Sequence, residues 1–159
     1  METESKLAQW FKIDKSLTGY GKYLIDGNIY IPPRGTRFEN DAPFVEIQDE
    51  IVSFSDENLI CLTGDFNAHT KTGKDYIVVD EFMIDQLEFD PEVAIMLDDL
   101  NKLDSLGIEI DRKNKDIRDC NAYGNSLLQL CKAHNLIIAN RRVGNDSTGN
   151  YTAVNITQQ

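Results

Sequence analysis

The sequence predicts one domain of the α/β class, and three observations support this. Segments with the apolar pattern of strands alternate along the chain with segments of helical spacing, which is the order expected of α/β folds. The length of 159 residues suits a single domain with a sizeable core. A hydrophobic content of 41% and a charged content of 27% are typical of a globular protein.

The first half of the chain begins with two strand-like segments followed by a helical one. Leu7–Ile13 has the composition of a strand or a short helix. Tyr23–Ile31 is a second strand candidate, and a proline pair ends it because proline cannot donate to a β ladder. Apolar residues at helical spacing then predict a helix from Phe44 to Phe54, with Asp41 as its cap.

In the second half, helical spacing predicts an amphipathic helix that begins at Asp90–Pro91 and continues to Leu103. Asn121–His134 is the clearest helix, and Asn135 follows it at the position of a C-cap. Beyond this helix we expect two strands with a turn between them: Leu136–Ala139, the turn Gly144–Asn150, and Tyr151–Ile156.

The stretch after the predicted buried strand Leu59–Leu62 carries the clearest chemistry. Gly64 is expected to end the strand and open a loop, as at the carboxyl ends of strands in α/β sheets. Asp65 and Asn67 are two residues apart, so their side chains share a face while the backbone stays extended. Such a pair can hold a hydrated metal or a water against an anionic substrate. The alternative is a turn in which both side chains bond their own backbone.

Charge and cysteine content limit the classes of function. The net charge is −11, but the segment Asp80–Asp111 accounts for −10 of it, with eleven acidic residues and a single lysine. We interpret this segment as a solvated acidic face, which disfavours nucleic-acid binding there because phosphate contacts need Lys and Arg. The three cysteines have no close pair spacing and are expected to be reduced thiols that pack as small apolar groups.

The chain shows no signal for a membrane. No apolar stretch approaches the ~20 residues of a membrane-spanning helix. The N-terminal residues are polar and acidic, and no apolar region follows them as it would in a signal peptide. We therefore expect an intracellular protein, nuclear or cytoplasmic, without membrane partners.

Several blocks in order resemble the endonuclease/exonuclease/phosphatase superfamily, particularly its retrotransposon-type endonucleases. Gly64–Asn67 matches the GDFN signature of that family letter for letter. The other blocks are similar to its YxPP strand end, its NxxGxxLLxLC helix, its LxIxN strand and its G-x-[FY]-T strand start, and they lie at Tyr30–Pro33, Asn121–Cys131, Leu136–Asn140 and Gly149–Thr152.

This resemblance implies a four-layer α/β sandwich that hydrolyses phosphodiester or phosphomonoester bonds with Mg²⁺, or with Mn²⁺ in its place. Carried over by position, Asp65 orients the attacking water and contributes one metal ligand, Asn67 hydrogen-bonds the water or the phosphoryl group, and Tyr30 donates to a phosphate oxygen. The implied partner of the complete domain is nucleic acid, with DNA first. For Tyr30 the alternative is simple packing, because tyrosine is common in strands.

The sequence also departs from the family pattern. The family opens with an Asn-bearing strand and a metal-binding Glu, and it closes with an Asp strand and an Asp-His pair; neither set is found between Met1 and Gln159. We therefore expect a polar segment at residues 1–9 and a partial domain at residues 10–159, an incomplete four-layer sandwich that is inactive as this chain alone. One carboxylate with one amide would be a weak Mg²⁺ site.

Two other functions stay open at this stage. The chain could be a noncatalytic remnant of a mobile element that binds a protein partner, or a phosphatase or phosphodiesterase for a small phosphate ester. Neither histidine matches a catalytic motif of the family. A guanidinium suits phosphate, but most surface arginines do not bind it, so three arginines are left outside the predicted site: Arg112, Arg141 and Arg142.

Overall fold

The protein divides into two compact units, and each is described by itself. Unit 1 comprises Met1–Ala68 with Asn121–Leu130, and unit 2 comprises His69–Cys120 with Cys131–Gln159. The structure is a computed structural model, and it describes residues 5–54, 58–88, 90–114 and 118–142.

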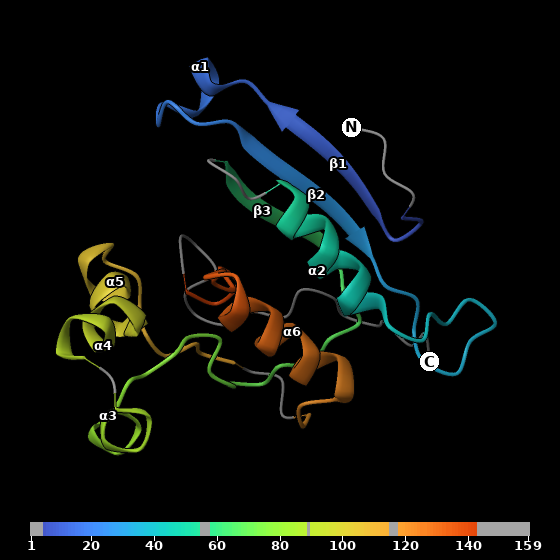
Figure 1. Cartoon of the computed structure of the whole chain (residues 1–159). Helices are drawn as coiled ribbons and strands as arrows, with labels where there is room; N and C mark the ends of the chain where they lie inside the picture. The colour runs from blue at the N-terminus through green and yellow to red at the C-terminus, as the bar shows by residue number, and fades with distance from the viewer. Residues whose placement is uncertain (1–4, 55–57, 89, 115–117, 143–159) are drawn as a thin grey trace. The chain divides into compact units, whose positions relative to one another are not determined.

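Unit 1 is built on a three-stranded sheet with the order β1-β2-β3 (Figure 1). β1 runs antiparallel to β2, whereas β2 and β3 are parallel. Helix α2 lies between the two parallel strands in the chain, so β2, α2 and β3 form the strand–helix–strand unit of an α/β fold. The α/β class is thereby confirmed, while the four-layer sandwich stays a prediction. The bounds are Ala8–Ile13 for β1, Leu24–Tyr30 for β2, Pro43–Phe54 for α2 and Leu59–Asp65 for β3.

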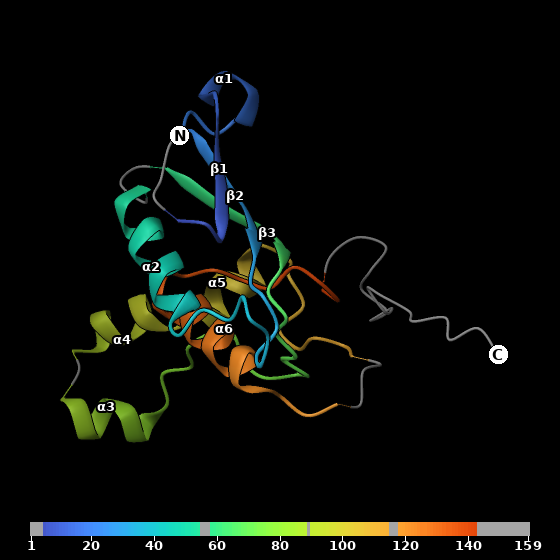
Figure 2. The same ribbon diagram turned by 90° about the vertical axis from the view of Figure 1, so that its right-hand side faces the viewer.

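Helix α2 covers one face of this sheet (Figure 2), and an aromatic contact fixes it there. The rings of Trp10 and Phe54 meet edge to face with centroids 5.1 Å apart, and Trp10 Nε1 donates to Glu50 Oε2 over 2.8 Å. Gly27 makes room for the indole, since a Cβ at this position would lie 2.6 Å from Cζ3 of Trp10. The prediction of strands in this part of the chain is thus confirmed. The face of the sheet that carries Gly27 is the face that packs into the core.

Alternate residues of β2 are buried because they share the face of the sheet that α2 covers. Ile25 and Ile29 share the Gly27 face of β2 and are each 1% exposed. On α2, Ile47 and Ile51 lie one helical turn apart and are equally buried. The predicted cap Asp41 is wrong in one detail, because the helix begins at Pro43 and Ala42 therefore holds the N-cap position. The Ala42 amide itself donates to Asn40.

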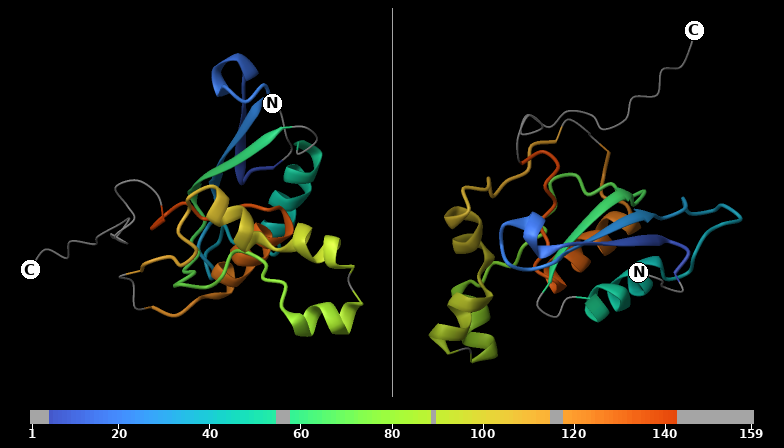
Figure 3. Two further views of the ribbon diagram at one scale, coloured as in Figure 1. Left: turned by 90° about the vertical axis from the view of Figure 1, so that its left-hand side faces the viewer. Right: turned by 90° about the horizontal axis from the view of Figure 1, so that it is seen from above.

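The acidic segment of unit 2 forms three short helices rather than one long one (Figure 3). The predicted continuous helix from Asp90 to Leu103 is wrong, because the chain turns extended at Asp98, whose carboxylate accepts from the Leu100 amide and starts a new helix. Asp90 does cap its helix by accepting from the Glu92 amide. A further helix, capped by Asp80, was missed. The bounds are Glu81–Leu87 for α3, Pro91–Leu97 for α4 and Asp99–Ser105 for α5.

Helix α6 (Ala122–Ala133) confirms the clearest prediction of the sequence. Asn121 caps its start by accepting from the Gly124 amide over 2.6 Å. At its end Asn135 adopts a left-handed conformation with φ 53°, and the Leu136 amide donates to the Cys131 carbonyl over 2.9 Å. These are the features of a Schellman C-cap, as predicted for Asn135.

The predicted strand Leu136–Ala139 is wrong, because this segment forms no strand in the structure. The Ile138 amide donates to Oδ2 of Asp75 over 2.7 Å, so a side chain occupies the place that a neighbouring strand would take. The predicted turn Gly144–Asn150 and strand Tyr151–Ile156 lie outside the described residues. In the described ranges, no helix combines the length and apolar character needed to cross a membrane.

Candidate active site

The carboxyl ends of β2 and β3 bring two of the predicted site residues together. In the parallel register Tyr30 lies opposite Asp65, and the Ile31 amide donates to the Asp65 carbonyl over 2.9 Å. Ile29 and its partner Gly64 share the α2 face, so Tyr30 and Asp65 lie on the opposite face. Both residues are exposed, Tyr30 to 56%. This end of the sheet can therefore be reached from solvent.

Gly64 permits this close pairing of the two strands. Its φ is 124°, which favours glycine, and an added Cβ would lie 1.9 Å from the Ile29 carbonyl oxygen. The expectation that Gly64 ends the strand is wrong, because β3 continues through Asp65. The glycine instead lets β3 stay paired with β2 up to the candidate catalytic carboxylate.

Asn67 does not lie on an extended backbone as expected. Its φ is 47°, and β3 has already ended at Asp65. The Asn67 amide donates to Oδ1 of Asp65 over 2.9 Å, and the Asn67 side-chain Nδ2 donates to the Ile31 carbonyl over 2.8 Å. The alternative turn is therefore observed for Asp65, whose carboxylate accepts from the local Asn67 amide, but not for Asn67, whose side chain bonds a distant strand end.

Asn121 supports the same loop and was missed as a site residue. Its Nδ2 donates to the Asn67 carbonyl over 3.0 Å, while its Oδ1 caps helix α6. One side chain therefore ties the start of α6 to the loop after β3, across 54 positions of sequence. The sequence signal was present, because an asparagine directly before a helix is a typical N-cap, but the pattern does not show what its second polar atom contacts.

The arrangement leaves groups available for chemistry. An ionised carboxylate accepts at about four lone-pair positions, and Asp65 uses one of them for the Asn67 amide. Asp65 can therefore also accept from a water molecule. Tyr30, which lies opposite Asp65 on the same face of the sheet, carries a hydroxyl that can donate. The side-chain carboxamide of Asn67 bonds the Ile31 carbonyl, so the main effect of this side chain in the structure is to hold the loop.

The residues described around Asp65 do not fit a complete magnesium site. Mg²⁺ prefers several oxygen ligands in near-octahedral order. Among the residues that the structure describes, no group of three or more His, Cys, Asp or Glu side chains could hold a metal ion. Asp65 can contribute one ligand.

Two of the arginines left outside the site are part of the interior of unit 2. Arg112 donates to Thr70 Oγ1 over 2.8 Å and to the Gly73 carbonyl over 2.6 Å. Arg142 makes two bonds of 2.8 Å to the carboxylate of Asp75. Both guanidinium groups are buried, so they stabilise unit 2 and do not face a substrate.

The cysteines carry free thiols, as the sequence predicted. Cys61 lies beside Asp26 on the sheet face that also carries Tyr30 and Asp65. Burial, aided by the negative charge of Asp26, raises the pKa of the Cys61 thiol. Burial likewise raises the pKa of Cys131 to about 12, with the charge of Asp75 as the next cause. Both thiols therefore stay protonated at neutral pH and are poor nucleophiles.

No family model, curated protein or solved structure matches this chain. The relation to the endonuclease/exonuclease/phosphatase superfamily therefore stays a prediction from the sequence blocks.

Proposed function

We propose that this chain contains the water-orienting part of a phosphodiester hydrolase of the endonuclease/exonuclease/phosphatase type, nuclease-like and derived from a mobile element. The main support is that three separate motif blocks meet in unit 1. Tyr30 pairs with Asp65, and Asn67 is held by both the Ile31 carbonyl and Asn121. A turn formed by chance after a strand would not require contacts from two other motif blocks.

In the proposed reaction Asp65 accepts a proton from a water molecule while the water oxygen attacks phosphorus and the bond to the leaving oxygen breaks. The backbone N–H of Asn67 donates to Oδ1 of Asp65, which leaves Oδ2 free to take the proton. The Tyr30 hydroxyl donates to a phosphate oxygen and stabilises its developing charge.

We further propose that hydrolysis by this chain alone is weak or absent. The family reaction uses a divalent ion, and Asp65 with an amide supplies too few oxygen ligands for tight binding. The absence of a three-ligand group among the described residues supports this part of the proposal, and it also supports a second candidate function, a noncatalytic protein-binding remnant. A phosphatase for a small ester would use the same three side chains.

Plasmid nicking tests the activity. Supercoiled plasmid is incubated with Mg²⁺ or Mn²⁺ and the protein, beside Asp65→Asn and the control Asp49→Asn, which changes an exposed carboxylate on α2. We expect nicking at background level for all three proteins. Turnover that Asp65→Asn abolishes and Asp49→Asn retains would contradict the expected inactivity and exclude the remnant.

Binding of a phosphodiester tests the site itself. We expect a dinucleoside monophosphate such as thymidylyl-thymidine, added with Mg²⁺, to shift the NMR amide signals of Tyr30 and Asn67. Tyr30→Phe should weaken this binding about 2- to 10-fold, the effect of one lost hydrogen bond. Tyr20→Phe, at an exposed tyrosine in the connection between β1 and β2, should not change it. If no shift occurs at either residue, the proposed hydrolase site is wrong.

A further inference from the structure

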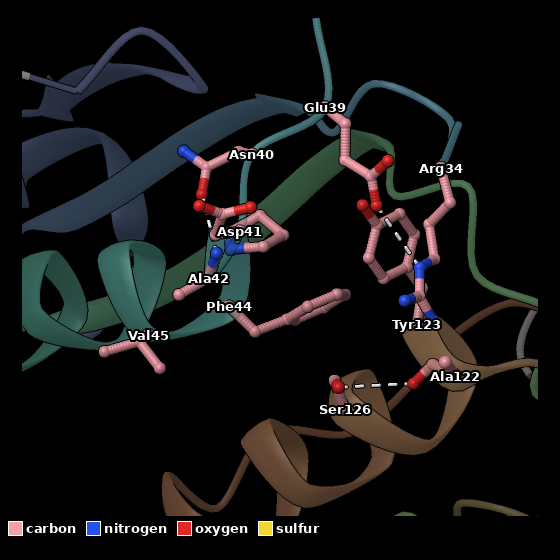
Figure 4. A pocket seen from close by; sticks show the side chains of 11 residues that line it. Arg34, Glu39, Asn40, Asp41, Ala42, Phe44, Val45, Ala122, Tyr123 and Ser126 are labelled. Carbon is pink, nitrogen blue, oxygen red and sulfur yellow. Dashed lines mark hydrogen bonds and ion pairs between the residues drawn. The ribbon is translucent and has the colours of Figure 1, made fainter. Parts of the chain in front are cut away.

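A pocket of about 370 Å³ opens in unit 1 where helices α2 and α6 begin (Figure 4). It is lined by residues 34 and 39–45, from the loop after β2 and the first turn of α2, and by residues 122, 123 and 126 of α6. Pockets of this size are large enough for a small planar ligand.

The pocket is continuous in sequence with the segments that hold the candidate active site. Ile31, whose carbonyl accepts from Asn67, is followed after the proline pair by Arg34 in the pocket wall. Asn121, which donates to the Asn67 carbonyl, directly precedes the pocket residues Ala122 and Tyr123. A ligand group in the pocket would therefore lie on the same two segments that position Asp65.

Aromatic rings form the inner wall. The Phe44 and Tyr123 rings lie 5.7 Å apart at a tilt of 57°, and both residues are more than nine-tenths buried. The guanidinium carbon of Arg34 lies 5.9 Å from the Tyr123 ring centroid. Aromatic faces and a guanidinium plane are the surfaces on which unpaired bases stack in proteins that bind single-stranded nucleic acid.

The Tyr123 hydroxyl is a buried polar group without a hydrogen-bond partner among the described residues. It points toward the Glu39 end of the pocket in Figure 4. A buried hydroxyl in this condition has lost its bonds to water without replacing them, so a ligand that bonded it would recover that free energy. The unsatisfied hydroxyl thus indicates a polar ligand in this pocket, separately from the aromatic lining.

The charges of the pocket favour a neutral ligand that donates hydrogen bonds. Among the described residues that line the pocket, Arg34 is the only cation, and it already pairs with Glu39 over 3.4 Å. Glu39 also accepts from the Gly35 amide over 2.6 Å, which fixes the carboxylate while leaving further lone pairs free. The exposed carboxylate of Asp41 adds a second negative charge. Two carboxylates against one guanidinium disfavour a phosphate and favour amino groups.

We propose that this pocket binds an unpaired nucleobase with an exocyclic amino group, as in cytosine, adenine or guanine, beside the phosphodiester at Asp65. The base lies against Tyr123 and Phe44, its amino group donates to Glu39, and the Tyr123 hydroxyl bonds a ring heteroatom. This inference extends the proposed function from a phosphodiester to a base-bearing substrate.

Cytidine and uridine are matched probes, because they differ only in the amino group at position 4 of the ring and the ring proton next to it. We expect cytidine to shift the NMR amide signals of Tyr123 and Ser126 and to bind about 10-fold or more tightly than uridine, the effect of one hydrogen bond to a charged acceptor. Equal binding of the two nucleosides, or no saturable shift with either, would overturn the proposal.

Two variants separate recognition from structure. Tyr123→Phe should weaken cytidine binding about 2- to 10-fold and yet raise the melting temperature, because it removes an unsatisfied buried hydroxyl. Glu39→Gln should abolish the preference for cytidine, since an amide can also donate to the uridine carbonyl. Unchanged cytidine affinity in Tyr123→Phe, or a preference for cytidine that persists in Glu39→Gln, would overturn the assigned contacts. Tyr20→Phe is the control for the first variant.

The nucleosides carry no phosphodiester, so this test is independent of hydrolysis. If cytidine binds while thymidylyl-thymidine leaves Tyr30 and Asn67 unaffected, the proposed hydrolase site fails and a base-binding pocket is still established. If the dinucleotide shifts Tyr30 and Asn67 while cytidine does not bind, only the pocket proposal fails.

Discussion

The two units of this protein have interiors of different kinds. Unit 1 packs isoleucines and aromatic rings between a sheet and a helix, as at Ile25 and Ile47, which are 1% and 0% exposed. Unit 2 instead buries ions, because Asp75 is 1% exposed and Arg142 is 4% exposed. The apolar contacts of unit 1 are nondirectional, whereas the interior of unit 2 depends on hydrogen bonds and an ion pair between a few specific atoms.

The ion pair of unit 2 joins segments far apart in sequence. Arg142 binds both carboxylate oxygens of Asp75 and also donates to the Ile110 carbonyl over 2.8 Å. The same carboxylate accepts from the Ile138 amide. Loss of either ion would leave a buried charge without its partner, so we expect unit 2 to tolerate change at these positions far less than apolar packing of similar size would.

Each unit contains its own spectroscopic or chemical probe. Trp10, the single tryptophan, lies in unit 1, so its fluorescence reports on the sheet and α2. Cys131 is buried in unit 2, so its protection from thiol reagents reports on the interior around Asp75. The comparison between the units can therefore be tested by substitutions in each.

The largest effect is expected for Gly64→Ala in unit 1. The new Cβ would meet the Ile29 carbonyl, a backbone atom that cannot move without breaking the β2–β3 pairing. Steric overlap and an unfavourable φ together should destabilise the protein by more than about 4 kcal/mol, measured by urea unfolding followed by Trp10 fluorescence.

Gly35→Ala is the matched control for this variant. Gly35 also has a positive φ, 77°, but a Cβ there would meet nothing within 4 Å. Only the conformational cost of about 1–2 kcal/mol should appear. Equal losses at the two positions would show that the close approach of β3 to β2 is not what makes Gly64 necessary.

The next effect is expected for Arg142→Met in unit 2, which leaves Asp75 buried without its cation. A loss of about 3–5 kcal/mol is typical of such a change, and it should appear as faster labelling of Cys131. The double variant Asp75→Leu/Arg142→Met should recover part of the loss, because no uncompensated charge is then buried.

Arg34→Met serves as its control. Arg34 pairs with Glu39 over 3.4 Å, and its side chain is 64% exposed. An exposed pair of this kind contributes about 0–1 kcal/mol. If Arg142→Met proved as mild as Arg34→Met, the description of unit 2 as an interior dependent on its ion pair would be wrong.

The last effect appears only at alkaline pH and concerns the pH dependence that Cys131 adds to unit 2. Burial raises the pKa of this thiol from 9.0 to about 12. Between these values the unfolded chain loses the proton and the folded protein keeps it. The contribution of Cys131 to stability is therefore complete below pH 9 and is lost as the pH rises toward 12.

The pH dependence can be measured by unfolding two proteins over a range of pH. The first carries Cys61→Ser and Cys120→Ser, and the second carries these two changes and Cys131→Ala. The difference in unfolding free energy between the two proteins should shrink above pH 9. A difference that stays constant from pH 8 to pH 11, or a Cys131 that reacts with iodoacetamide at pH 8 as fast as an exposed thiol, would contradict the buried position of this side chain.

Much of the local structure could be predicted from patterns in the sequence. The apolar pattern of strands predicted β2, helical spacing predicted α2 and α6, and Asn135 was correctly placed at a helix end. The sequence also identifies the carboxylate of Asp65 and the amide of Asn67 as candidate site groups. These features depend on neighbours within a few positions, and such neighbours are visible in a sequence.

Predictions that depended on distant partners were less successful. Leu136–Ala139 has the composition of a strand, but Asp75 takes the Ile138 amide and no strand forms. Asn67 was expected on an extended backbone, yet the Ile31 carbonyl and Asn121 hold it in a left-handed turn. Composition does not show which side chain will bind a backbone group from another part of the chain.

The sequence by itself determined the α/β class, the principal strands and helices of unit 1 and the identity of the polar groups around Asp65. Only the tertiary structure decided that Tyr30 lies beside Asp65, that Gly64 continues β3, and that unit 2 is built around a buried ion pair. The physical reason is the distance along the chain between the residues that interact. Periodicity and capping act between close neighbours, whereas strand register, buried charge pairing and loop support join residues dozens of positions apart.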